Sequence, residues 1–152
     1  MNDLVIRRAR PDDVEALTEG NVALAAETEG KRLDTDTVRR GVQAAFDDPA
    51  KGFYLVAEQE RRVVGQLMIT YEWSDWRNAD YWWVQSVYVW PDARRRGVFR
   101  ALHTRMAEMA RESGGVCGIR LYVEKENRVA QATYAALGLQ PARYHFYETE
   151  FD

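Results

Sequence analysis

The chain of 152 residues contains one cysteine, Cys117. A single thiol cannot form an internal disulfide, which agrees with a reducing compartment, and we expect Cys117 to be a buried structural thiol. No apolar run approaches the roughly 18 residues that a membrane-spanning helix requires. The first residues, MNDLVIRRARPDD, also lack the apolar core of a secretion signal. We therefore expect a cytoplasmic protein without a membrane partner.

The sequence also lacks a large excess of either charge, since 21 basic residues stand against 24 acidic ones and the net charge is −3. A general nucleic-acid binder would carry a broad basic face, so this balance argues against a nucleic-acid partner. Hydrophobic residues make up 46% and charged residues 30% of the chain, which is typical of a globular protein rather than a disordered one. No repeat, low-complexity tract or linker is present, and we predict one domain over residues 1–152.

Several well-known site motifs are missing as well. The two histidines, His103 and His145, have no metal-ligand partner at useful spacing, so we expect no metal site. No set of Ser, His and acid suggests nucleophilic catalysis. Neither a Gly-Lys-Ser/Thr P-loop nor a Gly-x-Gly-x-x-Gly fingerprint occurs.

Hydrophobic patterning predicts a mixed α/β domain that opens with helices. Short runs rich in β-branched and aromatic residues predict strands at 5–6, 53–58, 63–73, 82–89 and 118–123, and an alternating final strand at 144–151. Cap residues and periodic apolar positions predict helices that begin at residue 11 and after residue 34 or 35, and further helices at 97–113 and 127–137. The strands at 82–89 and 118–123 flank a helix, which favours a parallel crossover pair.

The stretch YVWPDARRRGVFRAL, residues 88–102, carries the strongest local signal. A strand-like run ends at a proline, three arginines follow, and Gly97 opens a helical pattern. The first amide N–H groups of a helix lack intrahelical partners and attract anions, and glycine lets a ligand approach the main chain closely. This order predicts a seat for a diphosphate. A basic surface turn that happens to precede a helix explains the stretch about equally well.

A second stretch, LYVEKENRVAQATYAALGLQPARYHFYE at residues 121–148, favours the diphosphate seat. The turn Arg94-x-x-Gly97-x-Phe99 and the element Asn127…Ala130…Tyr134…Leu137-Gly138, in this order and spacing, resemble the GNAT superfamily of acyl-CoA-dependent N-acetyltransferases. The family usually has Gly or Ala where Phe99 stands. We expect the Phe99 ring to turn into the core beside Leu102, leaving its backbone N–H available.

The resemblance implies an α/β fold with a mostly antiparallel central sheet, one splayed parallel strand pair and about four helices. It implies acetyl-CoA as co-substrate, with pantetheine along the strand before the turn and the diphosphate on the amides of residues 95–100. The cofactor-binding residues that it implies are Val87, Tyr88, Val89, Arg94, Arg95, Arg96, Gly97, Val98, Phe99, Arg100, Asn127, Ala130 and Tyr134.

For the chemistry, the resemblance implies that a primary amine attacks the thioester directly, without an acyl-enzyme. A backbone N–H near Val87 would polarise the carbonyl oxygen, and Tyr134 would protonate the departing thiolate. From its sequence position alone, Tyr134 could equally be an ordinary amphipathic core residue.

The proton acceptor for the attacking ammonium is less well marked. Many relatives supply an acid in the strand that here contains Gln85 and Ser86, neither of which is a base. The nearest upstream acids are Glu72, Asp75 and Asp80. By strand alternation Glu72 shares a face with other polar positions, and we choose it as the candidate base. The alternative is an ordered water held by Gln85 or Ser86.

All five tryptophans lie between positions 73 and 90, and some of these rings must build core. Others could form a wall for an apolar or cationic acceptor. The resemblance places acceptor contacts in the loop between the first two helices, at Glu27 and Glu29. The candidate substrate-binding residues are Glu29, Trp73, Trp76 and Gln85. A small-molecule amine is our first expectation for the acceptor, with a peptide N-terminus as the alternative.

Two other functions remain open at this point. A protein that keeps the acyl-CoA seat but has lost transfer activity would act as a sensor or partner module, and the missing acid at Gln85 and Ser86 favours it. A small nucleic-acid binder built on the arginine turn would show salt-dependent binding. By analogy with the family we also expect a possible homodimer.

Overall fold

A computed structural model describes residues 3–151. The order of elements is β1 (Val5–Arg8), η1 (Pro11–Asp13), α1 (Val14–Glu29), α2 (Thr35–Asp47), β2 (Phe53–Gln59), β3 (Arg62–Ser74), β4 (Ala79–Val89), η2 (Pro91–Ala93), α3 (Val98–Ser113), β5 (Val116–Arg120) and α4 (Arg128–Ala136). The chain divides into two compact units, one extending to Leu121 and a smaller one beginning at Tyr122. Within the described residues, no helix is both long and apolar enough to cross a membrane.

The five strands form one sheet in the order β1-β2-β3-β4-β5. Its first four strands pair antiparallel, whereas β4 and β5 pair parallel and are joined through α3. Parallel neighbours need such a crossover, because a tight hairpin can only reverse the chain. The predicted mixed α/β sheet, with one parallel pair and four helices, is confirmed.

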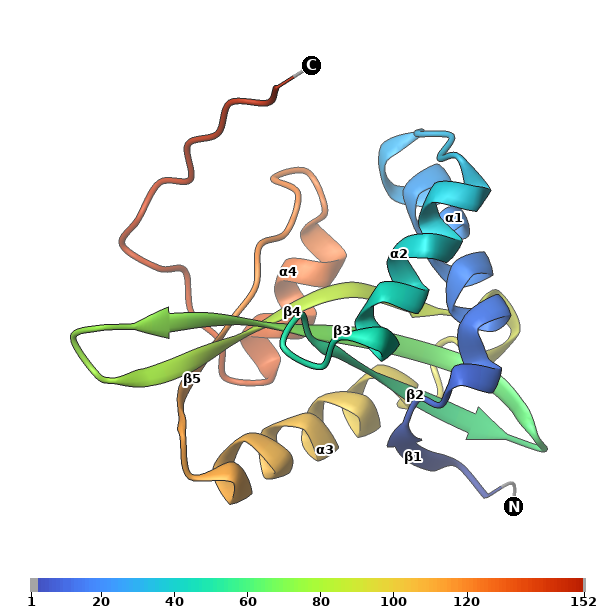
Figure 1. The fold of residues 1–152 in the computed structure, drawn as a ribbon, viewed down its shortest axis with the longest axis horizontal. Helices are drawn as coiled ribbons and strands as arrows, with labels where there is room; N and C mark the ends of the chain where they lie inside the picture. Colours follow the sequence, from blue (N-terminus) through green and yellow to red (C-terminus); the bar gives the residue numbers. More distant parts are fainter. Residues whose placement is uncertain (1–2, 152) are drawn as a thin grey trace. The chain divides into compact units, whose positions relative to one another are not determined.

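Two helical layers cover the two faces of this sheet (Figure 1). On one face, α1 and α2 pack Leu17 and Val42 against Tyr54 and Val56 of β2. On the other face, α3 packs its buried side chains against alternate residues of the same strands, and this larger cluster includes Leu55, Leu67, Ile69, Leu102 and Met106. The period of two along each strand divides the apolar residues between the two layers.

Most element ends follow the expected cap chemistry. The side chain of Asp34 accepts a hydrogen bond from the backbone N–H of Thr37 at 3.0 Å and caps α2. Gly30 ends α1 in a left-handed conformation, with φ of 63°. Because α1 runs to Glu29, Glu27 and Glu29 lie in its last turns, and their predicted loop position is wrong. The hairpin between β2 and β3 turns at Glu60 and Arg61, which both have positive φ.

The end of the sheet differs from the prediction in two ways. Strand β5 begins at Val116 rather than at residue 118, because Gly114 ends α3 and the carbonyl of Gly115 already accepts a hydrogen bond from the N–H of Asp80 at 2.9 Å. Cys117 is exposed on this strand, so the expected burial of its thiol is wrong.

The predicted final strand at 144–151 is also wrong, since residues 144–151 form no regular element. Alternation predicts a strand only where another strand supplies the hydrogen bonds, and no described strand pairs with this segment. In the C-terminal unit, Asn127 caps α4 by accepting a hydrogen bond from the N–H of Ala130 at 3.1 Å. The rings of Tyr122 and Phe146 stack with centroids 5.4 Å apart.

Candidate active site

Strand β4 loses its parallel neighbour halfway along its length. Residues 80–83 pair with β5, but no residue of β5 pairs with β4 beyond Trp83, while β4 continues to Val89. Strand β5 ends at Arg120, the partner of Trp83, so the rest of β4 has no parallel neighbour. On that side of β4, the backbone groups of the residues beyond 83 are left without a partner strand. A strand edge of this kind can pair with an extended ligand.

A β-bulge lies in the part of β4 beyond Trp83, where β5 is no longer its neighbour. Gln66 of β3 lies opposite Tyr88 and Met68 lies opposite Gln85, so that Leu67 faces both Ser86 and Val87. Ser86 has a φ of 52°, which is uncommon for a residue other than glycine. Bulges re-aim the backbone at the point where they occur, and strained backbone is concentrated at functional sites.

Strand β4 leads through η2 and the arginine turn into the N-terminus of α3. Gly97 is the N-cap residue with φ of 79°, and no side chain caps the helix. The first backbone bond of the helix runs from Ala101 N–H to Gly97 O at 3.0 Å. The N–H groups of the first helical turn precede that bond, and such groups have no acceptor within a helix. Apart from its own backbone and that of adjacent residues, nothing in the described chain lies within 4 Å of the point where a Cβ of residue 97 would stand.

The three arginines of the turn are exposed, and Arg95 has a left-handed φ of 64°. Arg94 differs from its neighbours, because its guanidinium has intramolecular partners. Its Nε donates to the carbonyl of Val89 at 2.8 Å and its Nη2 donates to Glu27 Oε1 at 2.8 Å. Arg94 thus holds the turn against the end of β4 and the end of α1. Arg95 and Arg96 form no ion pair with another described residue and are exposed to solvent.

Glu27 also accepts a hydrogen bond from the hydroxyl of Tyr88, at 2.5 Å. Burial and the adjacent carboxylate of Glu27 raise the pKa of Tyr88 to about 12. The hydrogen bonds from Tyr88 and Arg94 in turn lower the pKa of Glu27. Glu27 is therefore a carboxylate that holds the strand and the turn together, a role that its sequence position does not indicate.

Phe99 is half-buried and packs against the core cluster beneath α3, with its ring 6.1 Å from that of His103. The ring therefore turns toward the core, as expected from the sequence. Val87 and Val89 pack against the same cluster. The side chains of Val87 and Val89 thus face the core on the α3 side of the sheet.

A buried glutamine behind the bulge and its half-buried asparagine partner were missed by the sequence reasoning. Gln66 is 0% exposed, and its Nε2 donates to Asn21 Oδ1 at 2.8 Å and to the carbonyl of Ser86 at 3.4 Å. Asn21 Nδ2 donates in turn to the hydroxyl of Tyr54 at 3.2 Å. The available signal was a glutamine inside the apolar run VVGQLMI, since buried polar groups need partners.

The carboxylate chosen as base, Glu72, lies further along β3, opposite Tyr81. Its Oε1 accepts hydrogen bonds from Trp83 Nε1 at 2.7 Å and from Arg120 Nη1 at 2.9 Å. The hydrogen bond from Trp83, followed by that from Arg120, lowers the pKa of Glu72. A carboxylate held in this way is a weak proton acceptor.

The candidate acceptor-binding residues do not form one cluster of contacts. Trp73 is 63% exposed and donates to Asn78 at 3.3 Å, while Trp76 is 91% exposed in the β3–β4 turn. Gln85 lies next to the bulge and donates to the hydroxyl of Thr70 at 2.5 Å. Glu29 pairs with Lys31 at 3.2 Å on the surface. Of these four, Gln85 is the one that lies on β4 beyond Trp83, where β5 no longer pairs with it.

Asn127, Ala130 and Tyr134 belong to the C-terminal unit. The side chain of Asn127 is the cap of α4, and Ala130 supplies the N–H that it accepts. Burial raises the pKa of Tyr134, which keeps its hydroxyl protonated at neutral pH. That protonation state is the one that a proton donor requires.

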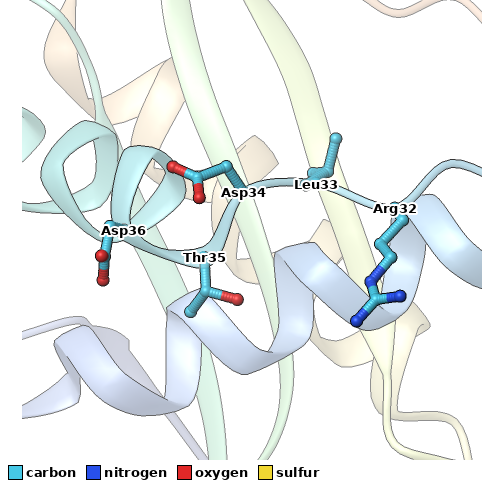
Figure 2. A pocket seen from close by; sticks show the side chains of 5 residues that line it. All are labelled: Arg32, Leu33, Asp34, Thr35 and Asp36. Atoms are coloured by element: carbon cyan, nitrogen blue, oxygen red, sulfur yellow. The ribbon is translucent and has the colours of Figure 1, made fainter.

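A hollow of about 430 Å³ lies elsewhere, over the loop from Arg32 to Asp36. Its labelled side chains diverge rather than converge on one point (Figure 2). Asp34 already caps α2 there, so we assign no chemistry to the hollow. Among residues 3–151, no group of three or more His, Cys, Asp or Glu side chains is arranged to hold a metal ion.

Comparison with known proteins shows the same architecture elsewhere. The Acetyltransferase (GNAT) family matches residues 19–139. The crystal structure of a possible acetyltransferase from Clostridium difficile 630 is 45% identical, with 98% of each chain covered and a TM-score of 0.93. No curated protein matches significantly.

Two more distant structures share the fold. A predicted acetyltransferase with acetyl-CoA from Clostridium acetobutylicum has a TM-score of 0.80 at 16% identity, over 97% of this chain and 96% of that one. A transcriptional regulator from Bacillus halodurans C-125 has a TM-score of 0.81 at 22% identity, over 98% and 100% of the two chains. The family match covers more than half of the sequence: the chain belongs to the GNAT acetyltransferase family, whose members use acetyl-CoA, and is an acyltransferase.

Proposed function

We propose that the chain transfers an acetyl group from acetyl-CoA directly to the primary amine of a small molecule, without an acyl-enzyme. One observation carries the proposal: the end of β4, which lacks a partner strand on its β5 side, contains a bulge and is followed by the N-terminus of α3, which no side chain caps. An extended arm that ends in a diphosphate needs hydrogen-bond partners along its length and a positive end for its charge. This stretch offers both.

The residues present fit coenzyme A. The backbone of Val87, Tyr88 and Val89 would face the pantetheine, although the carbonyl of Val89 already accepts from Arg94. The amides of residues 95–100, the open face of Gly97 and the exposed guanidinium groups of Arg95 and Arg96 would hold the diphosphate. Asn127, Ala130 and Tyr134 enter the proposal through the family motif that they complete.

When bound, acetyl-CoA supplies an activated thioester. The chain's own residues position and polarise it. In this proposal the N–H of Val87 donates a hydrogen bond to the acyl oxygen. This hydrogen bond strengthens as the oxygen gains negative charge in the transition state. Tyr134, protonated at neutral pH, donates its proton to the leaving sulfur. The amine nitrogen forms the new bond to the acyl carbon as the bond to sulfur breaks.

The attacking ammonium must first lose a proton. Glu72 stays the candidate acceptor on sequence grounds, but its ion pair with Arg120 and its lowered pKa weaken it. We therefore propose that an ordered water held by Gln85 or Ser86 accepts the proton from the ammonium. Replacing Glu72 by Gln should lower kcat less than about 10-fold, whereas loss of a general base costs about 100-fold or more.

The acceptor is proposed to be a small amine, with a peptide N-terminus as the second candidate. Trp73 and Trp76 expose large rings that an apolar or cationic acceptor could cover. A screen of small amines and short peptides, read by thiol release from acetyl-CoA, identifies the class. Calorimetry measures the Kd of coenzyme A in parallel. Tight binding without turnover on any amine would contradict the enzyme proposal and favour an acyl-CoA sensor.

We also propose a homodimer. In the C-terminal unit five aromatic side chains are exposed by 64% or more: Tyr122, Tyr144, Phe146, Tyr147 and Phe151. Exposed aromatic surface of this extent is typical of a protein–protein contact.

A further inference from the structure

The buried amide of Gln66 lies directly behind the bulge in β4. Its Nε2 reaches Asn21 of α1 and the carbonyl of Ser86, so that one side chain joins the helix to the bulged backbone. The shorter of these bonds, at 2.8 Å to Asn21, fixes the direction of the amide. The longer one, at 3.4 Å, holds the Ser86 carbonyl on the α1 side of the strand.

The position of that carbonyl determines where the next N–H points. In a trans peptide the C=O of one residue and the N–H of the next point in opposite directions. No cis peptide occurs in the described chain, so the Ser86 carbonyl and the Val87 N–H are opposed. Holding the carbonyl toward Gln66 therefore aims the Val87 N–H away from Gln66. Ser86 keeps a left-handed φ of 52°, and this strained backbone persists only where its surroundings hold it.

The packing around Gln66 leaves its amide little freedom. A Cβ at Gly20 of α1 would stand 2.2 Å from Gln66 Oε1 and 3.0 Å from the ring of Trp90. Glycine is therefore the residue that lets the helix lie against the amide. Within the described residues, Gln66 Oε1 is buried and has no hydrogen-bond partner. Leaving a buried acceptor unpaired costs free energy. We therefore infer that the orientation of the Gln66 amide is set by the two hydrogen bonds that its Nε2 donates.

We propose that Gln66 is a positioning residue for acetyl transfer: with Asn21 and Gly20 it holds the bulge so that the Val87 N–H is aimed at the acyl oxygen. The inference rests on the proposed function. If the Val87 N–H pointed elsewhere, the transition state of acyl transfer would lose a hydrogen bond and kcat would fall. The affinity for coenzyme A would change less, because coenzyme A has no acyl oxygen to accept that bond.

Three variants test the positioning role. Gln66→Met keeps the side-chain size and removes both donors, and we expect kcat to fall about 10- to 100-fold with the Kd of coenzyme A nearly unchanged. Gly20→Ala leaves Gln66 in place but pushes its flexible amide aside, and should lower kcat in the same way. Tyr54→Phe removes the far end of the network and keeps the Gln66–Ser86 contact, so it should retain kcat.

A second measurement does not depend on turnover. In wild-type protein the amide proton of Val87 should shift downfield in NMR when bound coenzyme A is replaced by bound acetyl-CoA, and in Gln66→Met this difference should vanish. Unchanged kcat and an unchanged Val87 shift in Gln66→Met would overturn the positioning role alone. So would an equal loss of kcat in Tyr54→Phe. Wild-type protein that binds acetyl-CoA without acetylating any amine would overturn the proposed function, and the Val87 shift would still decide the role of Gln66.

Discussion

At the scale of single residues, Gly97 decides whether an anion can approach the turn. Its φ of 79° strains other residues, and its open side is where the phosphates are proposed to lie. Gly97→Glu should weaken coenzyme A binding by about 100-fold or more, because it adds a like charge and a side chain there. Calorimetry measures the Kd. Asn tolerates left-handed φ, so Gly97→Asn is the control and should bind within about 10-fold of wild type. If both variants bound coenzyme A equally well, the diphosphate would not bind next to Gly97.

Tyr134 is the second residue whose role can be separated from binding. Because burial raises its pKa, the hydroxyl stays protonated across the neutral range and can donate. Tyr134→Phe should lower kcat about 100-fold while the Kd of coenzyme A changes little. Thiol-release kinetics and calorimetry together give the two quantities. An unchanged kcat would leave Tyr134 as a packing residue of its helix.

At the scale of elements, the join between β1 and the first helix depends on a half-buried ion pair. Arg7 donates to both carboxylate oxygens of Asp13 at 2.8 and 3.0 Å, and the N–H of Arg10 adds a third bond at 2.7 Å. Burial alone would raise the pKa of Asp13, but these bonds outweigh it and the pKa is lowered. The carboxylate therefore contributes stability in its ionised form.

Asp13→Asn should accordingly lower the free energy of unfolding by about 3 kcal/mol at neutral pH, because it leaves Arg7 without its closest partner. The folded pKa lies below the ordinary value of 3.8, so the contribution is complete above that value and is lost as pH falls through the folded pKa. Urea unfolding at several pH values measures it. A gap between wild type and variant that stays constant from about pH 5 to pH 2 would contradict the assignment.

The β2–β3 hairpin carries a correctable strain. Glu60 and Arg61 have φ of 53° and 64°, values that suit Asn and Gly. Replacing them together by Asn-Gly should raise stability by about 1 kcal/mol and Tm by roughly 2–4 °C, measured by thermal unfolding. The opposite change, to Ile-Val, is the control and should lower Tm, because β-branched residues resist positive φ. If neither double substitution changed Tm, residues 60 and 61 would not have positive φ in the folded protein.

At the scale of the whole molecule, the exposed rings of the C-terminal unit predict self-association. Replacing Tyr147 and Phe151 by Ser should shift the light-scattering mass from dimer to monomer. The five aromatic side chains would bury on the order of 700 Å² of surface per protomer on dimerisation. This area is close to the roughly 800 Å² per partner of a standard protein–protein interface. Trp76, exposed in the β3–β4 turn, supplies the matched control, since Trp76→Ser should leave the dimer intact. A wild-type monomer at micromolar concentration would contradict the proposal.

The amino-acid sequence by itself determined where most elements begin and end, because caps, turn residues and apolar periods act over a few residues. The helix after Asp34, the helix after Gly97 and the five strands of the sheet were predictable for that reason. The arginine–glycine turn and its family resemblance were equally local. The final strand was not predictable, because alternation at 144–151 says nothing about whether another strand lies beside it.

Tertiary structure alone decided which polar groups meet. Glu27 and Arg94 are 67 positions apart, and Asn21 and Gln66 are 45 apart, yet each pair is hydrogen-bonded through the packing of α1 on the sheet. Strand register and the neighbouring layers decide where β4 loses its β5 neighbour, where the bulge at Ser86 lies and where the Val87 N–H points. Such long-range contacts leave no periodic trace along the chain, because each of them depends on how separate elements pack in space.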